Sequence, residues 1–145
     1  MIRKDDEDIM LFCDLKSSFD TKNIKKGFSQ DLLSFIKLHM LLSLCDGYNL
    51  DEIKIDFIVT CKCFENEVKK ADILSRVHSG LIANKDVFIN AILYPLLVKG
   101  EKCIKLGDFP QIAGLDINPD IKNKKVKLRL LTSSNYADDF VHCRI

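Results

Sequence analysis

Two cysteines with the spacing of a metal-binding pair, Cys61 and Cys63, close the most regular stretch of the chain, IKIDFIVTCKCF. A zinc site needs three or four converging soft ligands, and strong zinc signatures contain two such pairs. This chain has one pair, and Cys103, His142 and Cys143 stand at spacings that no zinc signature requires. Both cysteines also continue the apolar face of the stretch, where free cysteine is often buried. We therefore expect Cys61 and Cys63 to be core residues, and we expect no bound metal or other cofactor.

Nucleophilic catalysis requires a cysteine or serine held beside a base and an orienting group. The three histidines, His39, His78 and His142, are far apart in the sequence. The signature motifs of serine hydrolases, zinc proteases, P-loop enzymes and dinucleotide-binding enzymes are absent. We therefore predict no catalytic residues and a non-enzymatic function. A small enzyme with its site in the loops between residues 96 and 132 is a third alternative.

Local positive charge is the strongest functional signal of the chain. The net charge is only +1, from 22 basic and 21 acidic residues, so the protein as a whole is not drawn to nucleic acid or membranes. Residues 22–26 and 122–129, however, contain basic residues and no acid. A strand over 124–132 would set three of them on one face, about 7 Å apart, where they can follow a phosphate backbone or simply keep the face solvated. The candidates for binding an anionic partner are Lys125, Lys127, Arg129, Lys22, Lys25 and Lys26.

A helix is predicted over residues 29–47, with Ser29 as its cap and Gly47 just beyond its end. Ten of the fourteen residues from 32 to 45 are apolar, and at helical spacing they surround the helix. Either the rest of the domain encloses it, or part of it faces another subunit. The expected core stripe is Leu33, Ile36, Met40 and Leu44, and the expected side for a protein partner is Leu38, Leu41 and Leu42.

The remaining elements follow from periodicity and from turn residues. Strands are predicted where apolar and polar residues alternate, and Ile9, Leu11, Cys13 and Leu15 should form the buried face of the first. Residues 84–95 are either a short helix stopped by Pro95 or a strand. The predicted strands are 8–16, 53–64, 124–132, a hairpin of 96–99 and 102–106 around Gly100, and a short tail strand at 140–145; a helix is expected over 65–80 and a loop over 111–124.

This order predicts an α+β fold, with residues 1–145 forming a single domain. A mixed or antiparallel sheet of about five strands should pack on two or three helices. The acidic start, MIRKDDEDIM, differs from a secretory signal, and no run of eighteen apolar residues occurs. We therefore expect an intracellular, cytoplasmic protein that does not enter a membrane.

Two functional hypotheses remain open at this point. The first is a non-enzymatic binding protein, a small subunit or factor docked on a larger protein or ribonucleoprotein assembly such as the ribosome, with possible contacts to RNA phosphates. The near-zero net charge would place it at the periphery of such an assembly. The second is a viral or parasite effector, or a self-associating structural protein, that contacts protein partners through an apolar helix or a sheet edge. A homo-oligomer is possible under either hypothesis.

Overall fold

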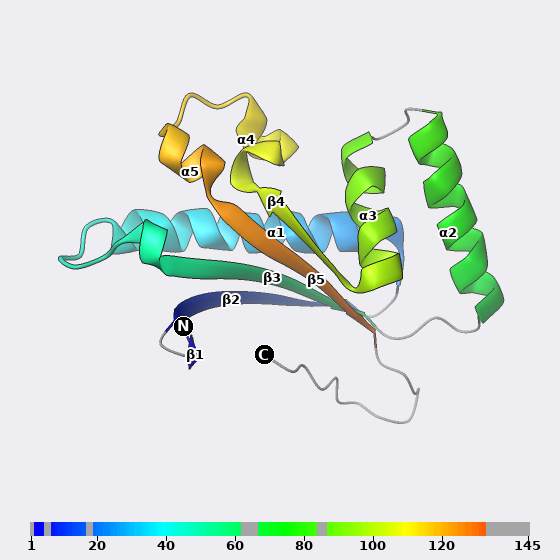
Figure 1. Cartoon of the computed structure of the whole chain (residues 1–145), viewed down its shortest axis with the longest axis horizontal. Helices are drawn as coiled ribbons and strands as arrows, with labels where there is room; N and C mark the ends of the chain where they lie inside the picture. The colour runs from blue at the N-terminus through cyan, green and yellow to red at the C-terminus, as the bar shows by residue number, and fades with distance from the viewer. Residues whose placement is uncertain (1, 5–6, 17–18, 62–66, 84–86, 133–145) are drawn as a thin grey trace.

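A computed structural model describes residues 2–4, 7–16, 19–61, 67–83 and 87–132. Five strands form one mixed sheet, in which the two central pairings are parallel and the two edge pairings are antiparallel. The expected α+β class is confirmed (Figure 1). The strands are β1 (Ile2–Lys4), β2 (Glu7–Lys16), β3 (Ile53–Cys61), β4 (Glu101–Lys105) and β5 (Lys125–Thr132), and their order across the sheet is β1-β2-β3-β5-β4.

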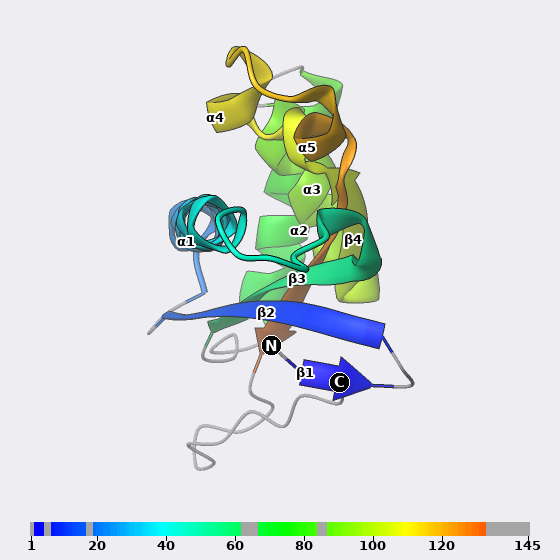
Figure 2. The same ribbon diagram turned by 90° about the vertical axis from the view of Figure 1, so that its left-hand side faces the viewer.

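The longer helices pack on one face of this sheet. Parallel neighbours need a crossover connection, and α1 provides the one between β2 and β3. Buried side chains of α1 and α3 share one cluster with β3 and β5, so both helices cover the same face of the sheet. Helix α1 lies behind the sheet in Figure 1 and to its left in Figure 2. The α-helices are α1 (Thr21–Leu42), α2 (Glu67–Ile82), α3 (Val87–Lys99), α4 (Pro110–Ala113) and α5 (Pro119–Asn123); two 3-10 turns are η1 (Leu50–Glu52) and η2 (Leu106–Asp108).

The central strand β3 has a parallel neighbour on each side and is buried along almost its whole length. Ile55, Phe57 and Val59 belong to the main core, and Ile58 is buried on the opposite face. The predicted burial of Cys61 is confirmed, whereas Cys63 lies outside the described residues. The predicted alternation of β5 is also confirmed, since Val126, Leu128 and Leu130 are buried and the residues between them are not.

Helix α1 begins earlier than predicted, at Thr21 instead of directly after Ser29. Its cap is Asp20, whose carboxylate accepts the backbone N–H of Lys22 at 2.6 Å, whereas Ser29 lies inside the helix. The first two turns are mostly polar, with Ile24 as their one large apolar residue, so the apolar periodicity did not indicate them. Gly27 in this part allows close packing, because a Cβ there would lie 2.7 Å from Cγ2 of Val59.

The predicted core stripe of this helix is wrong. Leu33, Met40 and Leu44 are exposed, and Ile36 is only partly buried at the margin of the core. The helix lies over the sheet with its first two-thirds, so its buried side starts before the apolar run that the prediction used. The observed stripe consists of Ile24, Phe28, Leu32 and Phe35.

The buried face of β2 is also the opposite of the predicted one. Met10 is buried, and the ring of Phe12 packs edge-on against Phe35 with 6.0 Å between ring centroids. Leu11 and Leu15 therefore lie on the open face, and Leu15 is 80% exposed. Alternation alone does not decide which face of a strand a helix will cover. In β2, α1 packs against the face of Met10 and Phe12, which has the less regular apolar pattern of the two faces.

Helix α3 resolves the ambiguity of residues 84–95 and overturns the predicted hairpin. It continues through Pro95 to Lys99, so residues 96–99 are helical. Gly100, with φ of +77°, ends the helix by donating its N–H to the carbonyl of Leu96 at 2.9 Å. The strand that follows is β4, as predicted from residue 102 onward.

The expected loop over 111–124 contains α5 and most of α4, and the predicted tail strand at 140–145 lies outside the described residues. Residues 2–4 form a short edge strand, β1, that the sequence did not indicate. In the part of the chain that the structure describes, no helix is both long and apolar enough to cross a membrane.

Candidate interaction surfaces

The basic ridge predicted on β5 lies on the face of the sheet that the long helices leave open. Lys125, Lys127 and Arg129 alternate with buried apolar residues of the same strand, so their side chains point away from the core. What this ridge can bind depends on the charges that the neighbouring strands bring beside it.

Two of the three cations have an acidic partner on an adjacent strand. The Arg129 guanidinium lies 2.9 Å from the carboxylate of Asp56 on β3, and Lys127 Nζ lies 3.3 Å from Glu101 on β4. Lys125 is exposed, lies opposite Lys105 of β4, and has no carboxylate within ion-pair distance among the described residues. The ridge is therefore much less positive than the sequence of β5 suggests.

The Asp56–Arg129 pair is largely buried beneath this surface. Burial raises the pKa of Asp56, although the nearby charges of Arg129 and Lys127 act to lower it. A buried pair of this kind gives little net stability, but removing one partner leaves an uncompensated charge. We therefore regard the Asp56–Arg129 pair as part of the sheet's own structure.

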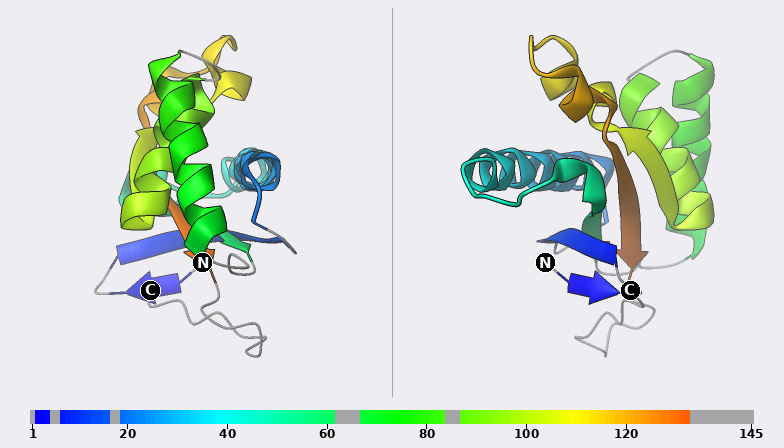
Figure 3. Two further views of the ribbon diagram at one scale, coloured as in Figure 1. Left: turned by 90° about the vertical axis from the view of Figure 1, so that its right-hand side faces the viewer. Right: turned by 60° about the vertical axis from the view of Figure 1, so that its left-hand side comes forward.

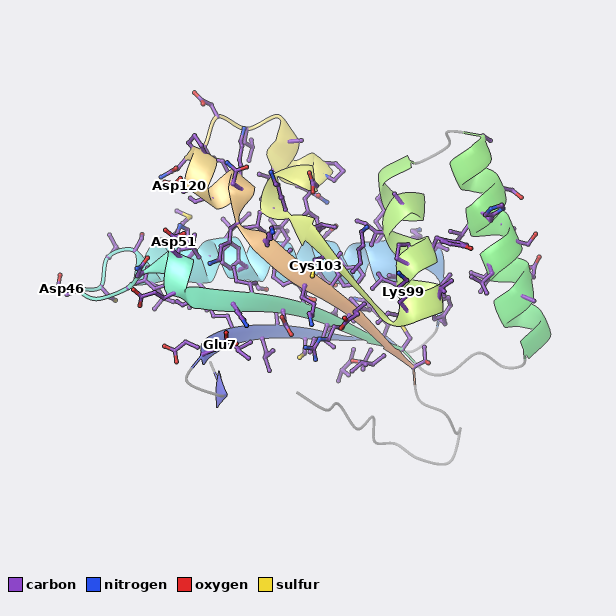
Figure 4. The ribbon with its side chains drawn as sticks, in the orientation of Figure 1. Glu7, Asp46, Asp51, Lys99, Cys103 and Asp120 are labelled. Atoms are coloured by element: carbon purple, nitrogen blue, oxygen red, sulfur yellow. The ribbon has the colours of Figure 1, made fainter. Side chains whose placement is uncertain are left out.

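A groove of about 750 Å³ opens beside the ridge. Its lining includes the first residues of β3 and β5, which pair with each other only from Asp56 and Lys127 onward. At its end, Lys124 Nζ donates hydrogen bonds to the carbonyls of Leu50 at 2.5 Å and Asp51 at 3.2 Å. Five basic and four acidic side chains line it, a mixture that gives no strong attraction for a polyanion. Figure 4 labels three of the acidic lining residues, Glu7, Asp51 and Asp120.

The second basic segment does not join the first. Lys22, Lys25 and Lys26 are exposed on the first two turns of α1, which covers the other face of the sheet. A single extended ligand cannot lie flat across both groups. The six candidate cations thus form two separate surfaces.

Exposed apolar side chains gather on the second half of α1 and in the turn that follows it. None of the residues from 36 to 42 is buried. The predicted partner side is only partly open, since Leu38 and Leu41 are exposed and Leu42 is half-buried. The exposed set is wider than the predicted one and consists of Leu33, Leu38, Met40, Leu41 and Leu44.

Asp31, Asp14 and Lys16 form a cluster of charged residues between α1 and β2 that the sequence pattern did not indicate. Asp31 of α1 is 4% exposed, and its Oδ2 has no hydrogen-bond partner among the described residues. Burial and the neighbouring Asp14 raise the pKa of Asp31 to about 7, against an opposing effect of Lys16. Lys16 Nζ lies 2.5 Å from Asp14 and donates to the amide oxygen of Gln30 at 2.7 Å. A carboxyl group in this state exchanges its proton near neutral pH.

The sequence signal for this group appears only when α1 is given its true start. Asp31 then falls between Phe28 and Phe35 on the buried stripe, where an acid is unusual. Neither Asp14 nor Asp31 lines the groove described above. Asp31 is therefore expected to affect stability and its dependence on pH and not binding in the groove.

The thiols and imidazoles are not grouped. Among the described residues, no three histidine, cysteine or acidic side chains are placed to hold a metal ion. Burial raises the pKa of the Cys61 thiol to about 11, which keeps it protonated at neutral pH. His39 stacks on Phe35 and shares a 2.8 Å hydrogen bond with the hydroxyl of Tyr48. His142 and Cys143 lie outside the described residues.

Comparison with known protein families, with curated proteins and with solved structures finds no match for this chain.

Proposed function

We propose that the chain is a non-enzymatic binding protein that docks on a larger assembly through the outer side of α1. The observation that carries this proposal is the group of five exposed apolar side chains on the second half of the helix and just beyond it. Single exposed leucines are common on protein surfaces, but contiguous apolar groups mark binding sites. Leu41 is 65% exposed, Met40 64% and Leu44 84%, so most of their area is available to a partner.

The spacing of these residues suits a partner that receives a helix. Leu33, Met40 and Leu44 recur at intervals of seven and four residues, and Leu41 lies beside Leu44. An amphipathic helix laid into an apolar groove presents its anchors at these intervals. Full burial of one leucine side chain stabilises a complex by about 1.5–3 kcal/mol. Lys37, exposed within the same group, would be matched by an acidic residue at the rim of the partner's groove.

The proposal is tested by the size of the complex that the tagged chain forms in its own cells. We expect wild-type chain to sediment well above its own mass of 16.6 kDa. Leu41→Glu should return it to the free fraction, because a charge cannot be buried in an apolar groove without a partner. Thr21→Glu adds the same charge at the exposed first residue of the same helix, twelve residues before Leu33, and should leave the complex intact.

Two results would contradict the proposal. One is wild-type chain that sediments only as the free protein, and the other is a Leu41→Glu variant that stays in the complex. Thermal unfolding of both variants, expected to resemble that of the wild type, separates lost docking from lost folding. A nuclease-treated extract serves as a further arm, since protein contacts through α1 should survive it.

A second candidate function is contact with RNA phosphates at the periphery of a ribonucleoprotein. It is favoured by Lys125 and Lys105, which lie opposite each other on β5 and β4 and are both exposed. Two adjacent lysines can each neutralise a phosphate and bind without regard to base sequence. The acids beside Lys127 and Arg129 limit the size of this patch.

A further inference from the structure

The outer side of α1 carries one row of side chains that begins basic and ends apolar. Positions three, four or seven residues apart fall on one line along a helix. The right-hand view of Figure 3 looks nearly along α1, whose outer side faces away from the sheet. The row opposite the buried stripe consists of Lys22, Lys26, Leu33, Lys37 and Met40, all exposed, and Leu44 continues it in the turn beyond the helix.

Every charged residue of this row is a lysine. The one acid of α1, Asp31, lies on the buried side of the helix and is 4% exposed. Among the described residues, Lys22, Lys26 and Lys37 have no carboxylate within ion-pair distance. From Lys22 to Met40 the row is about 27 Å long, at 1.5 Å per residue. The helix therefore presents basic charge and apolar surface in line, over a length that one partner can follow.

We infer that the protein partner docked on α1 is acidic, with carboxylates opposite Lys22 and Lys26 and an apolar strip opposite Leu33, Met40 and Leu44. The inference rests on the docking proposed above and names the chemistry of the partner. Complementary charges at the rim of a contact raise the association rate and fix the register of the two surfaces. Because the two lysines stand at one end of the row, such a partner is seated in one direction only.

The arrangement of the row favours a protein over a lipid surface, a nucleic acid or a second copy. A helix that lies on a membrane buries an apolar face along its length, whereas the row has no apolar residue before Leu33. A phosphate backbone offers Met40 and Leu44 no apolar surface to pack against. A two-fold contact between two α1 helices would use the same row on both copies, which contains no carboxylate for the lysines.

The first arm of the test is charge reversal outside the apolar group, by Lys22→Glu with Lys26→Glu in the tagged chain. Acidic residues near a helix N-terminus are favourable, so this variant should fold as stably as the wild type. We expect it to sediment with the complex roughly tenfold more weakly at low salt, with a smaller difference at high salt. The matched control, Lys99→Glu with Lys102→Glu at exposed positions of α3 and β4, should bind as the wild type does.

The second arm detects the contact directly in the isolated wild-type complex. A carbodiimide joins an amine to a carboxylate only where the two groups lie in contact. It should therefore link Lys22 or Lys26 to an aspartate or glutamate of the partner, as identified by mass spectrometry. Lys99 and Lys102 should give no such links.

The outcomes separate this inference from the proposed docking. A complex that Leu41→Glu leaves but Lys22→Glu with Lys26→Glu does not would overturn the acidic partner and keep the docking. A wild-type chain that forms no complex would overturn both. Equal weakening by the Lys99 and Lys102 control would overturn the inference by showing an effect of net charge alone. Loss of the complex on nuclease treatment, or binding of purified chain to phosphatidylserine vesicles that the Lys22 and Lys26 variant abolishes, would also overturn it.

Discussion

Asp31 is a carboxyl group held inside the molecule on the buried side of α1, close to Asp14. In the folded chain its pKa is raised to about 7, whereas in the unfolded chain it returns to the ordinary value of 3.8. Between these two values the folded state binds more protons than the unfolded state, so stability falls as pH rises. Below about pH 4 this cost is absent, and above about pH 7 it is complete.

We expect Asp31→Asn to abolish most of this pH dependence. The free energy of unfolding of the wild type should decrease between about pH 4 and pH 7, by up to roughly 1.4 kcal/mol per unit. The variant, which is neutral and of the same shape, should be more stable than the wild type at pH 8 and similar to it at pH 4. Urea unfolding at a series of pH values measures both curves, and parallel curves would show that Asp31 is already ionised in the fold.

At the scale of single elements, α1 offers the sharpest contrast between two sides of one helix. Phe35 is fully buried against Phe12 and Phe57, whereas Met40 is largely exposed. We expect Phe35→Ala to lower the free energy of unfolding by about 3–5 kcal/mol through loss of buried area and formation of a cavity. Met40→Ala should change it by less than about 0.5 kcal/mol.

Chemical denaturation of the two variants under identical conditions makes this comparison. Equal losses would mean that the helix is rotated from the position described, and would restore the core stripe predicted from sequence. Ile36→Ala should fall between them, because Ile36 packs at the margin of the core.

Strands with a long apolar run or a regular alternation of apolar and polar residues could be predicted from sequence. The alternation of β5 and the apolar run of β3 identified both strands and the direction of Lys125, Lys127 and Arg129. The start of α1 could not be found, because its first turns are mostly polar and its cap is a single aspartate. Helix α3 was ambiguous because apolar residues lie all around it, and a short apolar run is compatible with a helix and with a strand.

At the scale of the whole molecule, the order of the strands in the sheet determines which charges surround a side chain, and the sequence of one strand does not show this. The ridge on β5 was visible in the sequence, but its acidic neighbours, Asp56 and Glu101, come from strands that only the sheet order places beside it. Asp14 and Asp31 likewise meet only because α1 crosses back over β2. Local patterns therefore predict where a side chain points, and the topology determines the charge around it.

If the open face binds RNA, the cations should contribute unequally. We expect Lys125→Glu to weaken binding of unstructured RNA more than Lys127→Glu, because Lys127 is already engaged by Glu101. Each lost phosphate contact should reduce the slope of log affinity against log salt by about one, with no dependence on base sequence. Lys37→Glu on α1 changes the net charge equally and serves as the control in a titration at several salt concentrations. Equal effects of all three variants would indicate attraction by net charge alone.

The position of β5 in the sheet has a consequence for how the chain folds. β5 is the last strand of the described sequence, yet it lies between β3 and β4, and its residue Lys127 pairs with Asp56, more than seventy residues earlier. Contacts of such long sequence separation form slowly, because a large loop must close first. During synthesis, β3 and β4 must wait with open edges until β5 leaves the ribosome, and in that interval the nascent chain is most exposed to aggregation.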